Sequence, residues 1–137
     1  MCGYVGFTNN IDNSNLVISD MMDRIKHRGP DSEGKYLDDG TALGFRRLSI
    51  IDLAQGDQPI LNEDGTKILL FNGEIYNFQD LRKDLVDAGH IFKTKTDSEV
   101  LLHGYEEHGT DLLNKLRGMF SFVIWDKNQK ELFGARD

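Results

Sequence analysis

The sequence predicts an α+β fold in which one β-sheet packs on another and helices cover the outside. Segments that resemble strands gather toward both ends of the 137-residue chain, with helix-like segments between them and no repeated β-α-β alternation. Residues 119–125 (MFSFVIW) are apolar apart from Ser121 and do not alternate with polar residues. We therefore expect both faces of that strand to be covered, as in a layered sandwich.

The first elements follow from local pattern. Residues 3–8 (GYVGFT) are rich in β-branched and aromatic types between turn formers, which indicates a strand. Apolar residues from Ile18 to Ile25 recur at helical spacing, and the segment 27–30 (HRGP) ends that helix with basic residues, glycine and proline. Two further strands are expected at residues 34–37 and 41–52.

A strand over residues 67–71 (KILLF) leads into the sequence NGEIYN. Asn77 is a candidate cap for a helix that carries an apolar face and ends near Gly89. A short strand is predicted over residues 90–94, after which Thr96 and Glu99 have the spacing of a capping box. The box opens a helix through about residue 107. The remaining elements are a short helix at 111–116, a strand at 118–126, a turn at 127–131 and a strand at 132–137.

Composition restricts the class of protein. The formal net charge of −7 argues against nucleic acid or an anionic membrane as the main partner. Apolar residues make up 39% and charged residues 28%, as in a folded single domain, and no apolar run is long enough for a transmembrane helix. One cysteine cannot form an internal disulfide, so we expect a cytoplasmic protein.

That cysteine is Cys2, directly after the initiator Met1. Removal of Met1 would give Cys2 a thiol and a free α-amine on the same carbon. Because an α-amine has a pKa of about 7.7–8.0, it is partly neutral near pH 7 and can accept the thiol proton. Cys2 is therefore a candidate nucleophile that carries its own base. The alternative is a small apolar residue buried in the first strand.

Attack on an amide also requires hydrogen-bond donors for the oxyanion. The Asn72 side-chain amide and the Gly73 backbone N–H are candidates for these donors. Asn-Gly is equally a turn signal at the end of a strand, and from the dipeptide alone this alternative is favoured.

Charged candidates complete the set. Arg47 is a candidate to bind a carboxylate, with a solvated surface charge as the alternative, and its neighbour Arg46 is expected to be such a solvated charge. Asp97 and Glu74 are candidates to receive an ammonium group, although Asp97 also fits a helix start and Glu74 an ordinary surface position. The sequence contains no phosphate-binding glycine loop. No metal site is predicted from the spacing of the histidines, which are His27, His90, His103 and His108.

Eight segments stand in order along nearly the whole chain: MCGYVGF, HRGPDSEG, RRLSIIDL, GDQPI, FNGEIYNF, TDSEVLLHGYEEHG, LRGMFSFVIWD and LFGARD. Together they resemble the glutaminase domain of glutamine-dependent asparagine synthetases, which are class II amidotransferases with an N-terminal nucleophile. The motifs RGPD, RRLSIIDL and NGEIYN favour this branch over glucosamine-phosphate synthases and phosphoribosyl-pyrophosphate amidotransferases, which share the nucleophile.

The resemblance implies a four-layer αββα sandwich of two antiparallel sheets, the N-terminal-nucleophile hydrolase type of fold. It also implies that Cys2 is the nucleophile and that Asn72 and Gly73 form the oxyanion hole. The implied reaction is attack on the side-chain amide of glutamine, release of ammonia, and hydrolysis of a γ-glutamyl thioester to glutamate.

The same resemblance assigns the substrate contacts. Arg47 matches the residue that binds the α-carboxylate of glutamine, and Asp97, with Glu74, matches the groups that receive its α-ammonium. Phe45 and Asp57 stand where many relatives have histidine, and we expect them to affect only packing or a loop. The backbone that lines the pocket is implied to be that of Leu48, Ser49, Ile50 and Ile51.

Compared with the family, residues 1–137 are expected to form an amidotransferase domain that is incomplete at its C-terminus and lacks the ATP-dependent synthetase domain. The resemblance therefore implies no cofactor here, with ATP and Mg²⁺ confined to that other domain. The expected partners are glutamine and the synthetase domain. A chain that ends within a strand also exposes a sheet edge, which favours self-association, for example as a homodimer.

The predicted function is therefore the release of ammonia from glutamine for ATP-dependent asparagine synthesis. Two alternatives stay open at this point: a catalytically silent truncated remnant, and an amidotransferase of the same type that supplies another acceptor, such as a sugar or a peptide. An intact mass distinguishes the enzyme from the remnant, because a retained Met1 leaves Cys2 without a free amine.

Overall fold

The computed structural model describes residues 2–9, 11–48 and 57–137. Its strands are β1 (Gly3–Thr8), β2 (Ser32–Leu37), β3 (Thr41–Arg47), β4 (Ile60–Leu61), β5 (Lys67–Ile75), β6 (Gly118–Asp126) and β7 (Glu131–Arg136). Its helices are α1 (Ser14–Arg24), α2 (Phe78–Asp87) and α3 (Glu99–His108), with 3₁₀ helices η1 (Lys26–Arg28) and η2 (Gly109–Lys115). In the described part of the chain, every helix is too short or too polar to cross a membrane.

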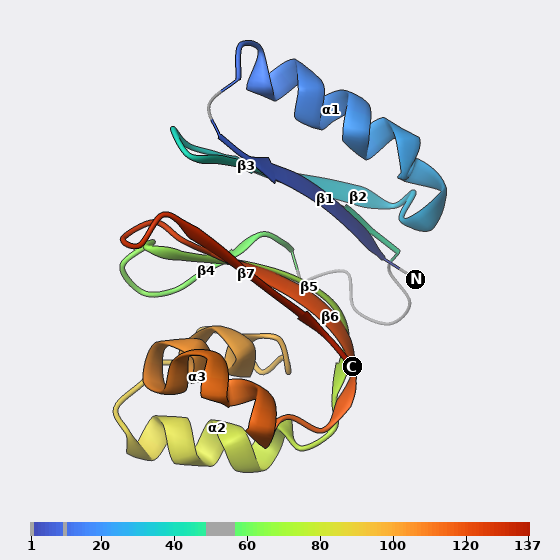
Figure 1. Ribbon diagram of the computed structural model, residues 1–137. Helices are drawn as coiled ribbons and strands as arrows, with labels where there is room; N and C mark the ends of the chain where they lie inside the picture. The colour runs from blue at the N-terminus through green and yellow to red at the C-terminus, as the bar shows by residue number, and fades with distance from the viewer. Residues whose placement is uncertain (1, 10, 49–56) are drawn as a thin grey trace.

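These elements form four layers (Figure 1). A three-stranded sheet of order β1-β3-β2 lies against a four-stranded sheet of order β4-β5-β6-β7, and neighbouring strands in both are antiparallel. Helix α1 covers the outer face of the first sheet, and α2 and α3 cover the outer face of the second. The predicted α+β sandwich of αββα type is confirmed.

Three clusters of buried side chains match the three interfaces between the layers. Alternate residues of a strand point to opposite faces. Along β3, Ala42 therefore packs with Ile18 and Met22 of α1, whereas Leu43 and Phe45 point between the sheets. The buried residues of β5 alternate in the same way: Ile68 and Leu70 lie between the sheets, and Leu69 and Phe71 lie under α2 and α3.

Strand β5 is longer than the sequence predicts. It continues past KILLF through Ile75, so Asn72 and Gly73 lie inside a strand and not in a turn. The turn alternative for Asn-Gly is therefore wrong. The strand predicted over residues 41–52 is observed over Thr41–Arg47, and residues 49–52 lie outside the described part of the chain.

The short strand predicted over residues 90–94 is absent, and these residues form an irregular loop. The backbone N–H groups of Lys93 and Thr94 donate instead to the Glu99 carboxylate, at 2.8 and 2.7 Å. Glu99 is thus not the partner of Thr96 in a capping box, although helix α3 does begin at this residue. The Glu99 side chain thus satisfies the two backbone N–H donors that a neighbouring strand would otherwise have satisfied.

Two other local predictions also differ in detail. Asn77 precedes α2, but its side chain bonds the Lys115 carbonyl and the Arg117 N–H, each at 2.9 Å, and does not cap the helix. Arg46 is not a solvated charge. Its side chain is 8% exposed, and its guanidinium pairs with Asp23 at 2.7 Å and Glu33 at 2.6 Å. Strand alternation explains this position, because Arg46 points toward α1.

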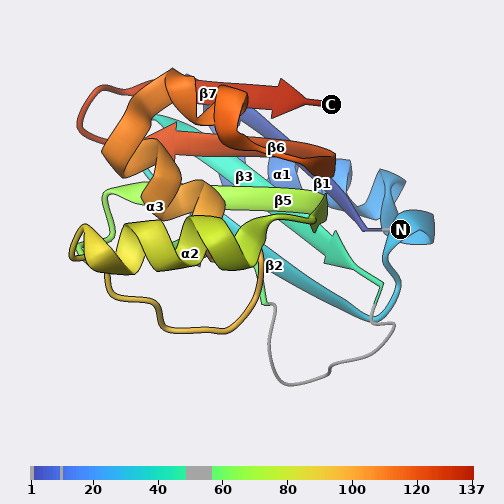
Figure 2. The same cartoon turned by 90° about the horizontal axis from the view of Figure 1, so that it is seen from below.

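The layers place two chain segments at one end of the sandwich. The N-terminus and the C-terminal end of β5 lie at that end (Figure 2). The antiparallel register agrees, since Gly3 pairs with Arg46 there and Thr8 pairs with Thr41 at the opposite end. Cys2, Arg47 and the last residues of β5 are thereby gathered at one end of the two sheets.

Candidate active site

The Cys2 thiol lies between the sheets at the start of β1. It packs on the cluster that contains Leu43 and Phe45, and it is partly buried. The Leu48 N–H donates to Cys2 Sγ at 3.4 Å, and Sγ lies 3.8 Å from the Leu48 carbonyl oxygen. Arg28 Nε also donates to the Cys2 carbonyl at 3.2 Å, a contact that sequence reasoning missed. The second residue of the chain is therefore held in place.

The side chain of Tyr4 connects this thiol to strand β6. Alternate residues of β1 share a face, so Cys2 and Tyr4 both point between the sheets. The Tyr4 hydroxyl hydrogen bonds the Ser121 hydroxyl, and Ser121 is the cross-strand partner of Asn72. Thus the strand that carries Cys2 lies against the pair of strands that carries Asn72.

The edge of β5 that faces away from β6 is lined with backbone N–H groups. The Phe71 N–H donates to Gln58 Oε1 at 2.6 Å, and the Ile75 N–H donates to Asp97 Oδ2 at 2.8 Å. In an antiparallel ladder, alternate residues direct their N–H groups to the same edge. The N–H of Gly73, midway between these two, therefore points to that edge as well.

Gly73 occupies a position that only glycine fits. Its φ of 151° lies in a region that L residues with side chains rarely adopt. A Cβ atom at this position would be 2.2 Å from the Met119 carbonyl oxygen and 2.6 Å from the Phe120 Cα. Strands β5 and β6 therefore lie close together at Gly73, whose N–H points to the open edge of β5, the edge away from β6.

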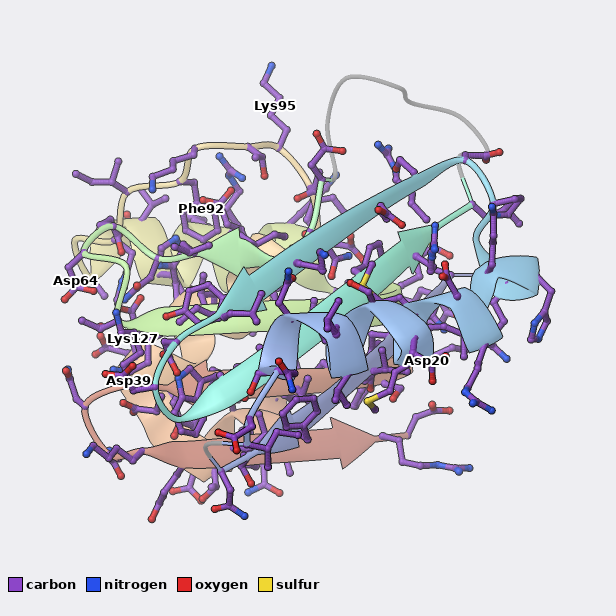
Figure 3. The ribbon with its side chains drawn as sticks, turned by 90° about the horizontal axis from the view of Figure 1, so that it is seen from above. Asp20, Asp39, Asp64, Phe92, Lys95 and Lys127 are labelled. Carbon is purple, nitrogen blue, oxygen red and sulfur yellow. The ribbon has the colours of Figure 1, made fainter. Side chains whose placement is uncertain are left out.

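A pocket of about 520 Å³ opens beside this edge, lined by residues 73–76, Phe78 and residues 95–97. This volume lies in the range of small-molecule sites. Glu74 and Asp97 give its wall a negative charge, whereas the Lys95 side chain extends outward from its loop (Figure 3). Burial raises the pKa of the Asp97 carboxyl, the hydrogen bond from Ile75 opposes that shift, and the charge of Glu74 adds to it.

Arg47 ends β3 at the same end of the molecule. Its side chain is only 12% exposed, and its Nη1 lies 3.4 Å from the carboxylate of Asp57, which is 92% exposed. Asp57 thus contacts Arg47, a residue predicted to bind substrate, so the effect of Asp57 is not confined to packing or to a loop. Three residues predicted to line the pocket, Ser49, Ile50 and Ile51, lie outside the described residues.

A larger hollow, of about 810 Å³, lies at the opposite end of the sandwich, next to the β2–β3 and β6–β7 turns. Its lining includes Asp38, Gly40, Trp125 and Lys130, and none of the predicted site residues. The smaller pocket is therefore the better candidate for the active site, because it adjoins Gly73 and Asp97.

Comparison with known families decides the class of this chain. The sequence profile of the family described as "Glutamine amidotransferase domain" matches residues 1–137. The chain belongs to this family. The amidotransferase domain is 48% identical over 143 residues to asparagine synthetase [glutamine-hydrolyzing] 1 of Bacillus subtilis (strain 168), and the match covers 100% of the chain and 22% of that protein. It is 42% identical to asparagine synthetase [glutamine-hydrolyzing] 1 of Arabidopsis thaliana, over 100% of the chain and 24% of that protein.

The resemblance inferred from the motifs is thereby confirmed, and the amidotransferase domain spans about a fifth of the length of the curated relatives it matches. Its fold also matches a solved structure of glutamine phosphoribosylpyrophosphate amidotransferase from B. subtilis, with a TM-score of 0.72 at 19% identity. That match covers 93% of this chain and 35% of the other, and it supports the fold alone.

Proposed function

We propose that the amidotransferase domain hydrolyses the side-chain amide of glutamine, with Cys2 as nucleophile. Asn72 and Gly73 donate to the oxyanion, and Arg47 binds the α-carboxylate of the substrate. Asp97, with Glu74, receives its α-ammonium, and the backbone from Leu48 to Ile51 lines the pocket. The positions of Cys2, Gly73 and Asp97 at one end of the sandwich support these roles.

The reaction begins with proton transfer within Cys2. After removal of Met1, the α-amine of Cys2 accepts the thiol proton, and the thiolate attacks the amide carbon. The oxyanion of the tetrahedral intermediate accepts hydrogen bonds from Asn72 and Gly73. The α-ammonium returns the proton to the leaving nitrogen, so that ammonia departs and a γ-glutamyl thioester forms. Water then attacks the thioester, the amine takes its proton, and glutamate and the free thiol are released.

The spacing of N–H groups on β5 is the observation that carries the proposal. Gly73 and Ile75 are two residues apart, which is about 6.6–6.8 Å along a strand. The Gly73 N–H is directed to the open edge, and the Ile75 N–H holds the Asp97 carboxylate. An extended glutamine separates its side-chain oxygen from its α-nitrogen by a similar length. One strand therefore supports both ends of this substrate.

The relatives are much longer than this chain, and their names state that they are asparagine synthetases. We propose that the ammonia serves ATP-dependent asparagine synthesis by a synthetase domain of a longer protein. ATP and Mg²⁺ would be needed in that domain, whereas the thioester chemistry here requires no cofactor. Strand β7 lies at the edge of its sheet in the described structure, and an open edge of this kind favours a homodimer.

A glutaminase assay combined with an intact mass tests the proposal. The chain that has lost Met1 should convert glutamine to glutamate and ammonia in equal amounts, and Cys2→Ala should abolish the conversion. A preparation that retains Met1 provides the matched control, because its Cys2 has no free amine. The proposal fails if Cys2→Ala releases glutamate as fast as the parent chain.

A further inference from the structure

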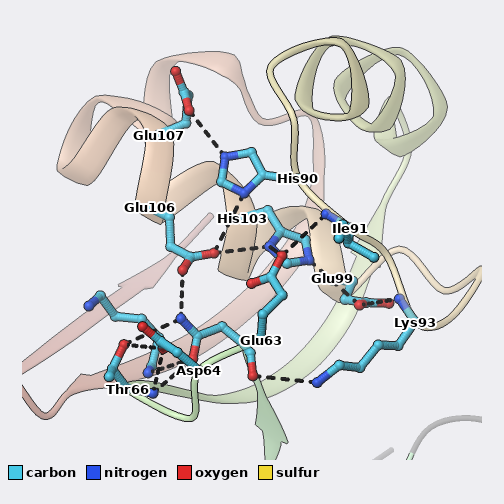
Figure 4. A network of polar contacts seen from close by, with 12 residues as sticks. Glu63, Asp64, Thr66, His90, Ile91, Lys93, Glu99, His103, Glu106 and Glu107 are labelled. Carbon is cyan, nitrogen blue, oxygen red and sulfur yellow. Dashed lines mark hydrogen bonds and ion pairs between the residues drawn. The ribbon is translucent and has the colours of Figure 1, made fainter.

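A cluster of two histidine and two glutamate side chains lies outside the pocket, on the side of α2 and α3 (Figure 4). Glu63 belongs to the turn between β4 and β5, His90 follows α2, and His103 and Glu106 lie on α3. One potential ligand atom from each of the four lies within 4.8 Å of the others. The spacing of the histidines in the sequence predicts no metal site, but the fold brings these two rings to a centroid distance of 5.1 Å.

The separations suit a small tetrahedral cation. His103 Nδ1 lies 2.9 Å from Glu106 Oε2 and 3.6 Å from Glu63 Oε1. His90 Nδ1 lies 3.8 Å from the same oxygen of Glu106. Tetrahedral zinc, with ligands at about 2.0–2.2 Å, places its ligand atoms about 3.3–3.6 Å apart. The four ligand atoms lie within 4.8 Å of one another, so movements of about 1 Å bring all of them to tetrahedral spacing.

His103 has a hydrogen-bonding conflict that a cation resolves. It is 1% exposed, its Nδ1 faces Glu106, and its Nε2 lies 3.6 Å from Glu99 Oε1 without a hydrogen-bond partner. A neutral imidazole has one N–H and one lone pair, so a neutral ring always directs its lone pair at a carboxylate. Two states relieve this repulsion: protons on both nitrogens, or a metal ion at Nδ1 with Nε2–H directed to Glu99.

His90 has the same arrangement. Its Nδ1 faces Glu106, and its Nε2 lies 3.1 Å from Glu107 Oε2. Histidines that bind metals generally donate their other N–H to a carboxylate or carbonyl, which sets the tautomer and the ring orientation. Both rings therefore turn Nδ1 inward and Nε2 toward a glutamate, as a pair of metal ligands with outer carboxylate partners would.

The outer carboxylate of His103, that of Glu99, is held in place by hydrogen bonds from the preceding loop. The Glu99 side chain is 3% exposed and accepts hydrogen bonds from Thr94 and Lys93. On the inner side, Glu63 and Glu106 place two carboxylates within 4.8 Å of each other, an arrangement that a divalent cation stabilises.

We propose that Glu63, His90, His103 and Glu106 form a structural site for a divalent transition-metal ion, Zn²⁺ by preference. Imidazole nitrogens favour Zn²⁺ over Mg²⁺ or Ca²⁺, which prefer oxygen ligands alone. Four protein ligands complete the tetrahedron, as in structural zinc sites. The ion joins the β4–β5 turn, the loop after α2, and α3. The proposal is independent of glutamine hydrolysis, since none of the four residues lines the candidate active site.

Zinc binding to the whole chain tests this directly. The titration uses the Cys2→Ala variant, freed of metal with a chelator, so that the thiol cannot bind the ion. Isothermal titration should show one Zn²⁺ per chain, and Co²⁺ should give the intense visible absorption of a tetrahedral complex. At a free Zn²⁺ concentration about 100-fold above Kd, Tm should rise by about 5–10 °C.

His90→Gln and Glu63→Gln, made in the same background, identify the ligands. Neither residue is fully buried, so circular dichroism can verify that both variants fold. Each should weaken Zn²⁺ binding at least about tenfold. His27→Gln, which removes an exposed histidine outside the cluster, is the matched control and should leave Kd unchanged. The proposal is overturned if binding is not stoichiometric, if Co²⁺ gives no tetrahedral spectrum, or if His27→Gln weakens binding as much as His90→Gln.

Discussion

Asp97 Oδ2 accepts a hydrogen bond from the backbone N–H of Ile75 at 2.8 Å, so the loop before α3 is attached directly to strand β5. This carboxylate is thereby placed two residues along the strand from Gly73. The same bond holds the carboxylate of Asp97 at the wall of the pocket. An ammonium group bound to Asp97 is therefore held at a set distance from the Gly73 N–H, which is proposed to stabilise the oxyanion.

Removal of the Asp97 charge should weaken glutamine binding and change its pH dependence. Because burial and Glu74 raise the pKa of Asp97, the carboxyl becomes ionised only above the ordinary aspartate pKa of about 3.9. The KM for glutamine should therefore fall as pH rises through that raised pKa. Asp97→Asn should raise KM at least about tenfold at pH 7, the cost of one charge-assisted hydrogen bond, and abolish this pH dependence.

Asp84→Asn, on the exposed side of α2, is the control and should leave both KM and its pH profile unchanged. The assignment of Asp97 to the ammonium group is wrong if Asp97→Asn lowers kcat while KM keeps its parental pH dependence.

The Asp97 carboxyl also makes the free energy of unfolding depend on pH, with a sign opposite to that of most carboxyls. Since the folded state binds the Asp97 proton more tightly, this group's contribution to stability falls as pH rises between the unfolded and folded pKa values.

The neighbours Arg46 and Arg47 should separate stability from activity. Arg46 is buried against α1 with two carboxylates, so Arg46→Ala should lower the free energy of unfolding by about 2–4 kcal/mol. Arg47 pairs with the exposed Asp57 at 3.4 Å, an ion pair that itself contributes less than about 1 kcal/mol, so we expect Arg47→Ala to lower the free energy of unfolding less than Arg46→Ala does. Urea denaturation measures both. In the assay, Arg47→Ala should raise KM strongly, and an unchanged KM would exclude it from the substrate site.

Gly73→Ala should damage both the fold and the reaction. The added methyl group would meet the Met119 carbonyl at 2.2 Å and require a φ that alanine rarely adopts. We expect a loss of about 1–3 kcal/mol in stability from the backbone strain alone. Displacement of the N–H should lower kcat on the order of 100- to 1000-fold. Gly65→Ala is the control, because Gly65 also has a positive φ but lies in the β4–β5 turn. It should lower stability through backbone strain and leave kcat unchanged.

If Arg47 binds the substrate carboxylate as proposed, we expect Asp57 to compete for it. The ion pair is long and its aspartate is 92% exposed, so it contributes less than about 1 kcal/mol. Asp57→Asn should accordingly lower the KM for glutamine, by no more than about fivefold, with kcat unchanged. Asp39→Asn, in the turn at the opposite end of the sandwich, should change neither value. A rise in KM for Asp57→Asn would show that the aspartate assists substrate binding.

The layered fold could be predicted because it depends on local pattern. The continuous apolar run in β6 and the helical spacing of apolar residues in α1 and α2 indicate directly which side chains need burial. The capping bonds of Glu99 and Asn77 were predicted wrongly. Glu99 bonds backbone groups of the loop just before it, and Asn77 bonds backbone groups that tertiary structure brings to it. The burial of Arg46 was missed for the same reason: its partners lie on other elements.

For the active site, residue types suggested Cys2, Gly73 and Asp97, but not the geometry that connects them. The open N–H of Gly73 depends on the register between β5 and β6, and the sequence of one strand does not specify its partner. Gln58, which bonds both backbone groups of Phe71 as a strand would, had no signal in the sequence. The histidine cluster was likewise invisible, because its ligands come from three separate segments.

Detection of the covalent intermediate tests the central proposal most directly. The chain without Met1 is mixed with glutamine, quenched in acid within one turnover, digested and mapped by mass spectrometry. A γ-glutamyl group should be found on the peptide that begins with Cys2, as a thioester that hydroxylamine removes. Release of glutamate without this adduct, or an adduct on any other residue, would contradict the account of Cys2 as the nucleophile.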